Sequence, residues 1–175
     1  MAETGFDPAV AQGGKAGELT AGGTVKLVQE LCSQLEQNEG FHGNIWPEGV
    51  TVDEEGRVTL AGASDEPVSE RSIDQVEYLA PEYFWENSGS PASDVYSLGM
   101  MLYSGCNNGY LPFQPKDGAL TEKDRAGALR KRMKGEAIPI PSGMSPEMGA
   151  VVRKALAYEP ADRYQSPAEL LDALK

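Results

Sequence analysis

The chain has 175 residues, of which 40% are hydrophobic and 24% charged, and its formal net charge at pH 7 is −12. This length suits one domain with a substantial core, because domains of about 100–150 residues are the most common. The acidic balance disfavours nucleic acid and anionic membranes as partners, since like charges repel. The sequence has neither an apolar run near the roughly 20 residues that span a bilayer nor a signal-peptide pattern, so we expect a cytoplasmic protein.

The acidic residues are concentrated between residues 36 and 86, where only Arg57 and Arg71 oppose a long series of Asp and Glu. Such a surface attracts basic peptides, although the same acids could serve only to keep the protein in solution. His42 is the only histidine, and Cys32 and Cys106 are isolated from each other. Because these residues form no ligand pattern, we expect neither a metal site nor a cofactor, and we interpret the cysteines as free thiols.

The first half of the chain predicts an arm, a helix and a hairpin. Residues 1–23 are rich in Gly and Ala without periodicity, which is typical of a flexible arm. Apolar residues recur at helical spacing over residues 24–39, with Thr24 as cap and Gly40 as the break. Residues 50–60 alternate apolar and polar side chains around a Glu-Glu-Gly turn, which predicts a hairpin. Residues 61–76 have no period and predict a loop.

The second half predicts four helices. Ser90-Pro91 begins one that is apolar on nearly all sides and therefore central. Residues 121–134 form an amphipathic helix with a basic end, Ser145-Pro146 begins a third, and Ser166-Pro167 begins the last with a capping box. We expect a mainly α-helical domain over residues 24–175 with one small β-hairpin.

Four motifs occur in the order found in the C-terminal lobe of protein kinases. They are HGNIWPEGV at 42–50, YLAPE at 78–82, DVYSLG at 94–99 and PADRYQS at 160–166. From about residue 24 onward, the chain resembles this lobe. The resemblance implies a buried ion pair between Glu82 and Arg163. It also implies that Asp94 accepts hydrogen bonds from the backbone of the loop at 42–50.

At the positions of the chemistry, the chain departs from the family. The family uses an aspartate as base, a lysine and an asparagine in the same loop, and a second aspartate on magnesium. Those positions hold Asn44, Trp46, Gly49 and Gly62, and Gly43 replaces the arginine that reads a phosphorylated loop. Residues 1–23 also have neither the glycine-rich loop nor the strand lysine of the kinase N-lobe. We therefore expect no N-lobe, no phosphoryl transfer and no enzyme, in other words a pseudokinase.

A free-standing lobe of this kind is similar in organisation to the non-catalytic KIND modules, which bind peptide segments. The leading hypothesis is a protein-interaction or scaffolding module with two candidate surfaces. One is an acidic face that binds a basic segment, with Asp53, Glu54 and Glu55 as candidates. The other is the face that an N-lobe covers, near Phe41, Trp46 and the start of the first helix, which a partner, a second copy in a homodimer or residues 1–23 could occupy.

Two alternatives stay open. Trp46 could plug the vacated nucleotide site from inside rather than face a partner. The chain could also be the C-lobe of a Ser/Thr protein kinase, or a nucleotide binder, that takes its N-lobe from another chain.

Overall fold

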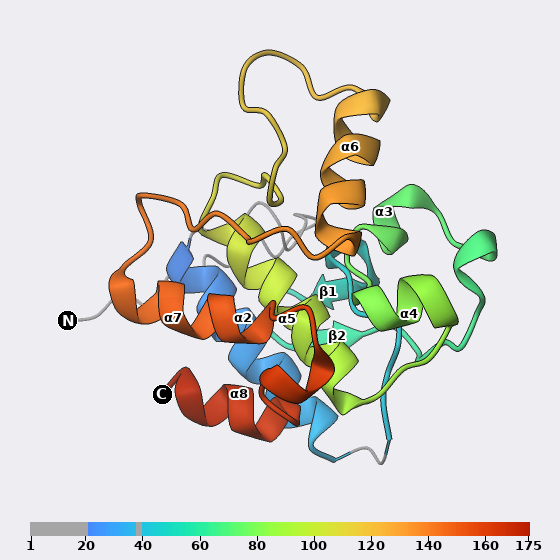
Figure 1. Cartoon of the computed structure of the whole chain (residues 1–175). Helices are drawn as coiled ribbons and strands as arrows, with labels where there is room; N and C mark the ends of the chain where they lie inside the picture. The colour runs from blue at the N-terminus through green and yellow to red at the C-terminus, as the bar shows by residue number, and fades with distance from the viewer. Residues whose placement is uncertain (1–20, 38–39) are drawn as a thin grey trace.

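The computed structural model describes residues 21–37 and 40–175 (Figure 1). Helices dominate this part of the chain, and its strands form one two-stranded antiparallel sheet. The expected mainly α fold with a small hairpin is confirmed. Most of the expected arm lies outside the described residues, but its last three residues, 21–23, belong to the first described helix.

The elements follow one another in the order expected from the motifs. The helices are α2 (Ala21–Leu35), α3 (Ile73–Val76), α4 (Pro81–Glu86), α5 (Pro91–Gly105), α6 (Glu122–Met133), α7 (Pro146–Ala155) and α8 (Pro167–Ala173). Short 3-10 turns are η2 (Pro47–Gly49), η3 (Val68–Glu70) and η4 (Pro160–Asp162). Strands β1 (Val50–Val52) and β2 (Val58–Leu60) pair with Val50 opposite Leu60 and Val52 opposite Val58.

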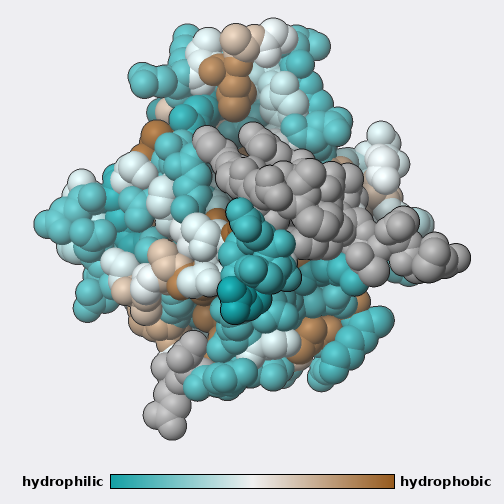
Figure 2. All heavy atoms as spheres, turned by 180° about the vertical axis from the view of Figure 1, so that it is seen from behind, coloured by the Kyte–Doolittle hydropathy of each residue, from teal (hydrophilic) through white to brown (hydrophobic). Residues whose placement is uncertain are grey.

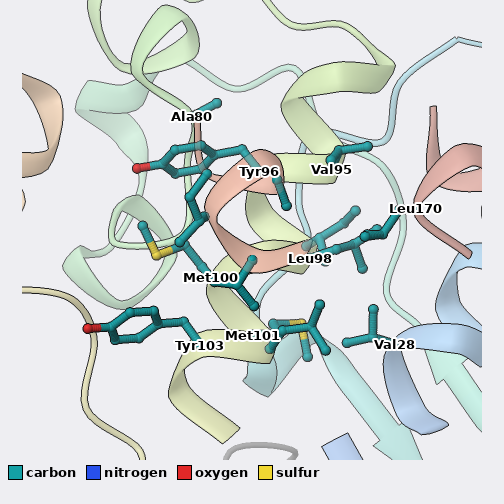
Figure 3. Close-up of a cluster of buried hydrophobic side chains, with 14 of the residues drawn as sticks. Val28, Ala80, Val95, Tyr96, Leu98, Met100, Met101, Tyr103 and Leu170 are labelled. Atoms are coloured by element: carbon teal, nitrogen blue, oxygen red, sulfur yellow. The ribbon is translucent and has the colours of Figure 1, made fainter. Parts of the chain in front are cut away.

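Helix α5 is the centre of the core. Every residue from Ala92 to Ser104 is buried, which agrees with its nearly uninterrupted apolar sequence. At its start the backbone N–H of Ser90 donates to the hydroxyl of Ser93 at 3.1 Å, and Pro91 fixes its first turn. In Figure 1, α2, α7 and α8 lie together along one side of α5, and Figure 3 shows its side chains meeting Val28 of α2 and Leu170 of α8.

One glycine sets the distance between α5 and α7. A Cβ atom at Gly99 would lie 2.8 Å from the Cβ of Ala155 and 3.0 Å from Leu156. Contacts that short are forbidden, so only glycine allows the two helices to approach so closely. This packing fixes α7, and with it the turn that carries Arg163, against the centre of the domain.

The structure differs from the sequence predictions at three places. Helix α2 begins at Ala21 and ends at Leu35, rather than covering 24–39. The expected loop at 61–76 contains η3 and the one-turn helix α3, which Ser72 and Gln75 stabilise through a capping box. Helix α4 was not predicted at all, because its six residues are too few to show a periodic pattern.

The surface is mainly polar. Figure 2 shows hydrophilic side chains over most of the described residues on the face turned away in Figure 1, with isolated hydrophobic ones between them. None of the described helices combines the length and the hydropathy that a membrane span requires.

Candidate functional site

The loop at 42–49 is held in place by Asp94 on α5. The Asp94 carboxylate accepts hydrogen bonds from the backbone N–H of His42 at 2.7 Å and of Gly43 at 3.0 Å. Burial raises the pKa of Asp94 to about 6, and the two hydrogen bonds only partly oppose this shift. The arrangement is the one that the resemblance implies.

A second anchor joins α4 to the turn after α7. The guanidinium of Arg163 donates from Nη1 and Nη2 to the two carboxylate oxygens of Glu82, each at 2.8 Å. Ser93 also donates to Glu82, at 2.6 Å. Burial by itself raises the pKa of Glu82, but the hydrogen bonds and charge of Arg163 outweigh it, so this pKa lies below its usual value.

The resemblance assigns Asn44 to the position of the family's base, and the Asn44 side chain is hydrogen-bonded on two sides. Its Nδ2 donates to the carbonyl oxygen of Gly62 at 3.2 Å, and its Oδ1 accepts from Gln75 of α3 at 3.2 Å. An amide cannot serve as a general base at neutral pH. Instead, the hydrogen bonds of Asn44 connect its loop to the segment after the hairpin and to α3.

Trp46 covers Gly49. A Cβ atom at Gly49 would lie 2.9 Å from Nε1 and 3.1 Å from Cδ1 of the indole. The indole therefore occupies the space into which any side chain at position 49 would project. Trp46 itself is half-buried, so it is neither fully inside the domain nor freely exposed.

Trp46 also lines a cavity of about 370 Å³ between the loop, α3 and the start of α6. Its walls combine aromatic and apolar groups with carboxylates, and Arg125 is its one basic residue. They consist of Trp46, Pro47, Glu48, Asp74, Glu77, Tyr78, Ser104, Gly109, Leu111, Gln114, Leu120 and Arg125. Three carboxylates against one guanidinium leave a net negative charge. We call this space the Trp46 cavity.

The acidic residues of the Trp46 cavity are positioned by α3. Because Ser72 fixes the start of this helix, Asp74 and Glu77 fall three residues apart on one of its sides. Sequence reasoning counted both among the acids but did not single them out. The capping pattern of Ser72 and Gln75 was the one available signal.

The other candidate residues lie elsewhere. Phe41 lines a separate cavity of about 880 Å³ with the C-terminal end of α2, Ala61, Gly62 and the start of α8. The expected apolar face near Phe41, Trp46 and the start of the first helix is therefore not a single cavity. Phe41 packs edge-on against the ring of Tyr83, with ring centroids 6.1 Å apart.

The acids of the hairpin turn form a third region. Glu54 and Glu55 line a hollow of about 910 Å³ between the turn and α2. Asp53 accepts hydrogen bonds from the backbone and the side chain of Arg57, which hold its pKa below the usual value. These residues do not reach the Trp46 cavity, so the acidic stretch of the sequence is divided between two surfaces.

Arg71 is an anchoring residue that sequence reasoning did not single out. It is buried, and its guanidinium donates to the carbonyl oxygens of Gly43 at 2.6 Å, Ser64 at 3.2 Å and Glu66 at 3.0 Å. It also donates to the hydroxyl of Tyr83 at 2.7 Å. Arg71 thus binds the segment after the hairpin to the loop and to α4.

The described residues include no group of three or more His, Cys, Asp or Glu side chains placed to hold a metal ion. Magnesium, which protein kinases use with ATP, does not fit the residues at its usual positions. Gly49 and Gly62 carry no side chain, and the indole of Trp46 lies over Gly49.

The sequence of this chain is similar to those of known protein kinases. Residues 56–173 match the protein kinase domain. The serine/threonine-protein kinase PknA of Mycobacterium tuberculosis (strain H37Rv) is 32% identical over 141 residues, which cover 76% of this chain and 31% of PknA. PknB of the same organism is 29% identical over 171 residues, which cover 88% of this chain and 26% of PknB. The chain thus spans about a third or less of the length of these relatives.

These comparisons correct one expectation. From the replaced residues we expected a protein that is not an enzyme, and that expectation is wrong. The relatives are named as Ser/Thr protein kinases and the domain match is to the kinase domain, so both findings point to a kinase. The chain belongs to the protein kinase family.

Proposed function

We propose that this chain is the polypeptide-binding lobe of a protein kinase-like protein, and that it binds a basic segment of a partner in the Trp46 cavity. The observation that carries the proposal is the composition of that cavity. Glu48, Asp74 and Glu77 line it together with Trp46 and Tyr78, and its volume of about 370 Å³ is large enough for one or two side chains. In such a site, carboxylates bind the charge of a basic side chain and aromatic rings pack on its stem.

The charge of the whole chain supports the same partner. With a net charge of −12, the protein attracts a basic segment at long range before any contact forms. The fixed positions of the cavity walls support it as well. Asp94 holds the loop that carries Trp46, and the Ser72 capping box holds the helix that carries Asp74. Because these walls are already ordered, little entropy is lost when a segment binds.

The experiment measures the affinity of the full chain for a dye-labelled, arginine-containing peptide by fluorescence anisotropy. We expect binding that weakens as salt is raised, because ion pairs at the rim of a site are screened. The double variant E48Q/D74N should bind about tenfold more weakly, which corresponds to about 1.4 kcal/mol. The matched control is E54Q/E55Q, which removes the same charge at the hairpin turn and should change affinity by less than about twofold.

Two results would contradict this proposal. One is equal weakening by the two double variants, which would mean that only net charge matters. The other is the absence of binding by the unaltered chain. W46A provides a second check, since loss of the aromatic wall should weaken binding without abolishing its dependence on salt.

A second candidate function is favoured by the names of the relatives. The chain could supply the C-lobe of an active Ser/Thr kinase when an N-lobe joins it. The cavity that Phe41 lines, at the end of α2 and beside residues 61–63, is the surface available for that lobe. This candidate predicts that an N-lobe that binds the chain, shown by their co-elution in size-exclusion chromatography, makes the melting temperature of the complex rise when ATP is added. An unchanged melting temperature of that complex would exclude it.

The scaffolding role and the cytoplasmic location of the protein stay predictions. A scaffolding role would follow if the bound segment belongs to a larger assembly, and a cytoplasmic location still rests on the sequence pattern alone. Co-purification from cells of the source organism, with fractionation, would test both together.

A further inference from the structure

We propose that Arg125 occupies the place in the Trp46 cavity that an arginine of the bound segment takes, so that this segment must displace it. The inference rests on the proposed function and specifies its ligand. It makes the key group of the partner a guanidinium rather than any positive charge, and it makes Arg125 an internal competitor.

The contacts of Arg125 carry the first step. Its Nε donates to Oε1 of Glu77 at 3.0 Å, and its Nη2 contacts both Glu77 and Asp74. One planar guanidinium therefore bridges two carboxylates of the cavity. The site is built for that shape, because five N–H donors in a fixed fork can reach two acceptors that a single ammonium group cannot engage in the same way.

The exposed fractions of the three side chains show that Arg125 reaches the cavity from the solvent side. The Glu77 side chain is only 4% exposed, whereas Arg125 is 24% and Asp74 49% exposed. Arg125 thus closes the deep carboxylate from the solvent side. A guanidinium of a partner that approaches from solvent meets the same two carboxylates in the same order.

Glu77 stays in position without Arg125. Its second oxygen accepts from Nε2 of Gln114 at 2.9 Å, and Gln114 is itself fixed by the backbone N–H of Leu111 at 2.8 Å. The main-chain oxygen of Glu77 accepts from the buried Arg132 at 3.3 Å. The acceptor is therefore held at both ends, and it remains aimed at the cavity when one guanidinium replaces another.

The position of Arg125 on α6 makes displacement feasible. Arg125 lies in the first turns of this helix, which the Thr121 capping box begins independently of the cavity. Because the Arg125 side chain is already partly exposed, it can turn outward into solvent. The capping box at Thr121 is unaffected by this movement. The exchange replaces one partly exposed ion pair by another, so the balance is governed by the rest of the bound segment.

The test compares three dye-labelled peptides with Gly-Ser flanks that differ only in two central residues: arginine, lysine or citrulline, which is the neutral isostere of arginine. Each is titrated against the full unaltered chain, R125M and K123M by fluorescence anisotropy. Lys123 is exposed on the same helix, so K123M removes the same charge outside the cavity. We expect R125M to bind the arginine peptide about threefold to tenfold more tightly than the unaltered chain does. The gain should be smaller for lysine and absent for citrulline.

The outcomes separate the two proposals. If the unaltered chain binds the arginine peptide and R125M binds no more tightly than K123M, the inference about Arg125 is wrong and the proposed function stands. An equal gain for the lysine peptide would also overturn it. If the unaltered chain binds no peptide, the proposed function fails and the inference fails with it. Should R125M lower the melting temperature by more than about 5 °C, R125Q takes its place: its amide can donate one hydrogen bond to Glu77, but it carries no charge and cannot bridge Glu77 and Asp74, so the arginine peptide should still gain affinity.

Discussion

Arg163 and Glu82 lie 81 positions apart in the sequence and meet through two hydrogen bonds of 2.8 Å each. The Arg163 side chain has no exposed surface, and that of Glu82 is 17% exposed. Arg163 also donates to the backbone oxygens of Ala157 and Ala92. The pair therefore joins α4, the start of α5 and the turn after α7, and a loss of Glu82 leaves a buried charge behind.

E82A should lower the free energy of unfolding by about 3–5 kcal/mol, because the stranded guanidinium of Arg163 has no carboxylate left. Urea denaturation followed by circular dichroism measures this value. The control is E86A on the same helix, since Glu86 is exposed and should change stability by less than about 0.5 kcal/mol. Similar effects of the two variants would contradict a structural role for the pair.

The contribution of Glu82 should depend on pH. Its pKa is lower in the folded chain than in the unfolded chain, so its stabilisation is present above the unfolded value, about 4.3, and is lost as pH falls through the folded value. The difference in unfolding free energy between the unaltered chain and E82Q should thus be largest near about pH 7 and shrink below about pH 4. A difference that stays constant over this range would show that Arg163 does not lower the pKa of Glu82.

R71M should destabilise the chain by about 2–4 kcal/mol, because the carbonyl oxygens of Gly43, Ser64 and Glu66 lose their donor. The segment from residue 62 to residue 70 should also become a site of rapid proteolysis, which mass spectrometry of limited digests detects. R57M is the control, since the Arg57 side chain is 75% exposed and pairs only with neighbours in the hairpin. Unchanged cleavage in R71M would rule out the proposed anchor.

G49A should push the indole of Trp46 out of its place, because the added methyl group would lie 2.9 Å from Nε1. In a W85F background, where Trp46 is the remaining tryptophan, its emission maximum should move to longer wavelength as the ring becomes more exposed to water. Affinity for the arginine peptide should fall in parallel. G62A is a matched control, since a methyl group at Gly62 meets no atom within 4 Å. An identical spectrum in G49A and in the W85F parent would be incompatible with the close contact.

The sequence predicted those elements that carry their own signals. Helices α5, α6, α7 and α8 begin where expected, because a capping signal is a local pattern of residues a few positions apart. The capping box predicted at Ser166 forms only in part: Ser166 accepts from the backbone N–H of Glu169, whereas the Glu169 carboxylate accepts from the backbone N–H of Gln165. Helices α3 and α4 were missed since four and six residues are too short for an apolar period. The early start of α2 was missed because Gly22 and Gly23 disfavour a helix in isolation.

The Trp46 cavity could not be predicted in the same way. Its walls come from four separate stretches of chain around residues 46–48, 74–78, 104–114 and 120–125, and nothing local indicates that they meet. The motif at 42–50 drew attention to Trp46. The close contact of its indole with Gly49, however, depends on three-dimensional packing. Arg71 was missed for a related reason, because its partners are backbone oxygens, which no sequence pattern marks.

The central claim is that a basic segment binds at the Trp46 cavity, and hydrogen–deuterium exchange with and without the arginine peptide tests it most directly. When the arginine peptide is bound, we predict slower amide exchange in the fragments of this chain that cover residues 46–50, 73–78 and 109–114, which line the cavity. Slower exchange confined to residues 40–43 and 60–63, or no change anywhere when the peptide is saturating, would contradict the claim.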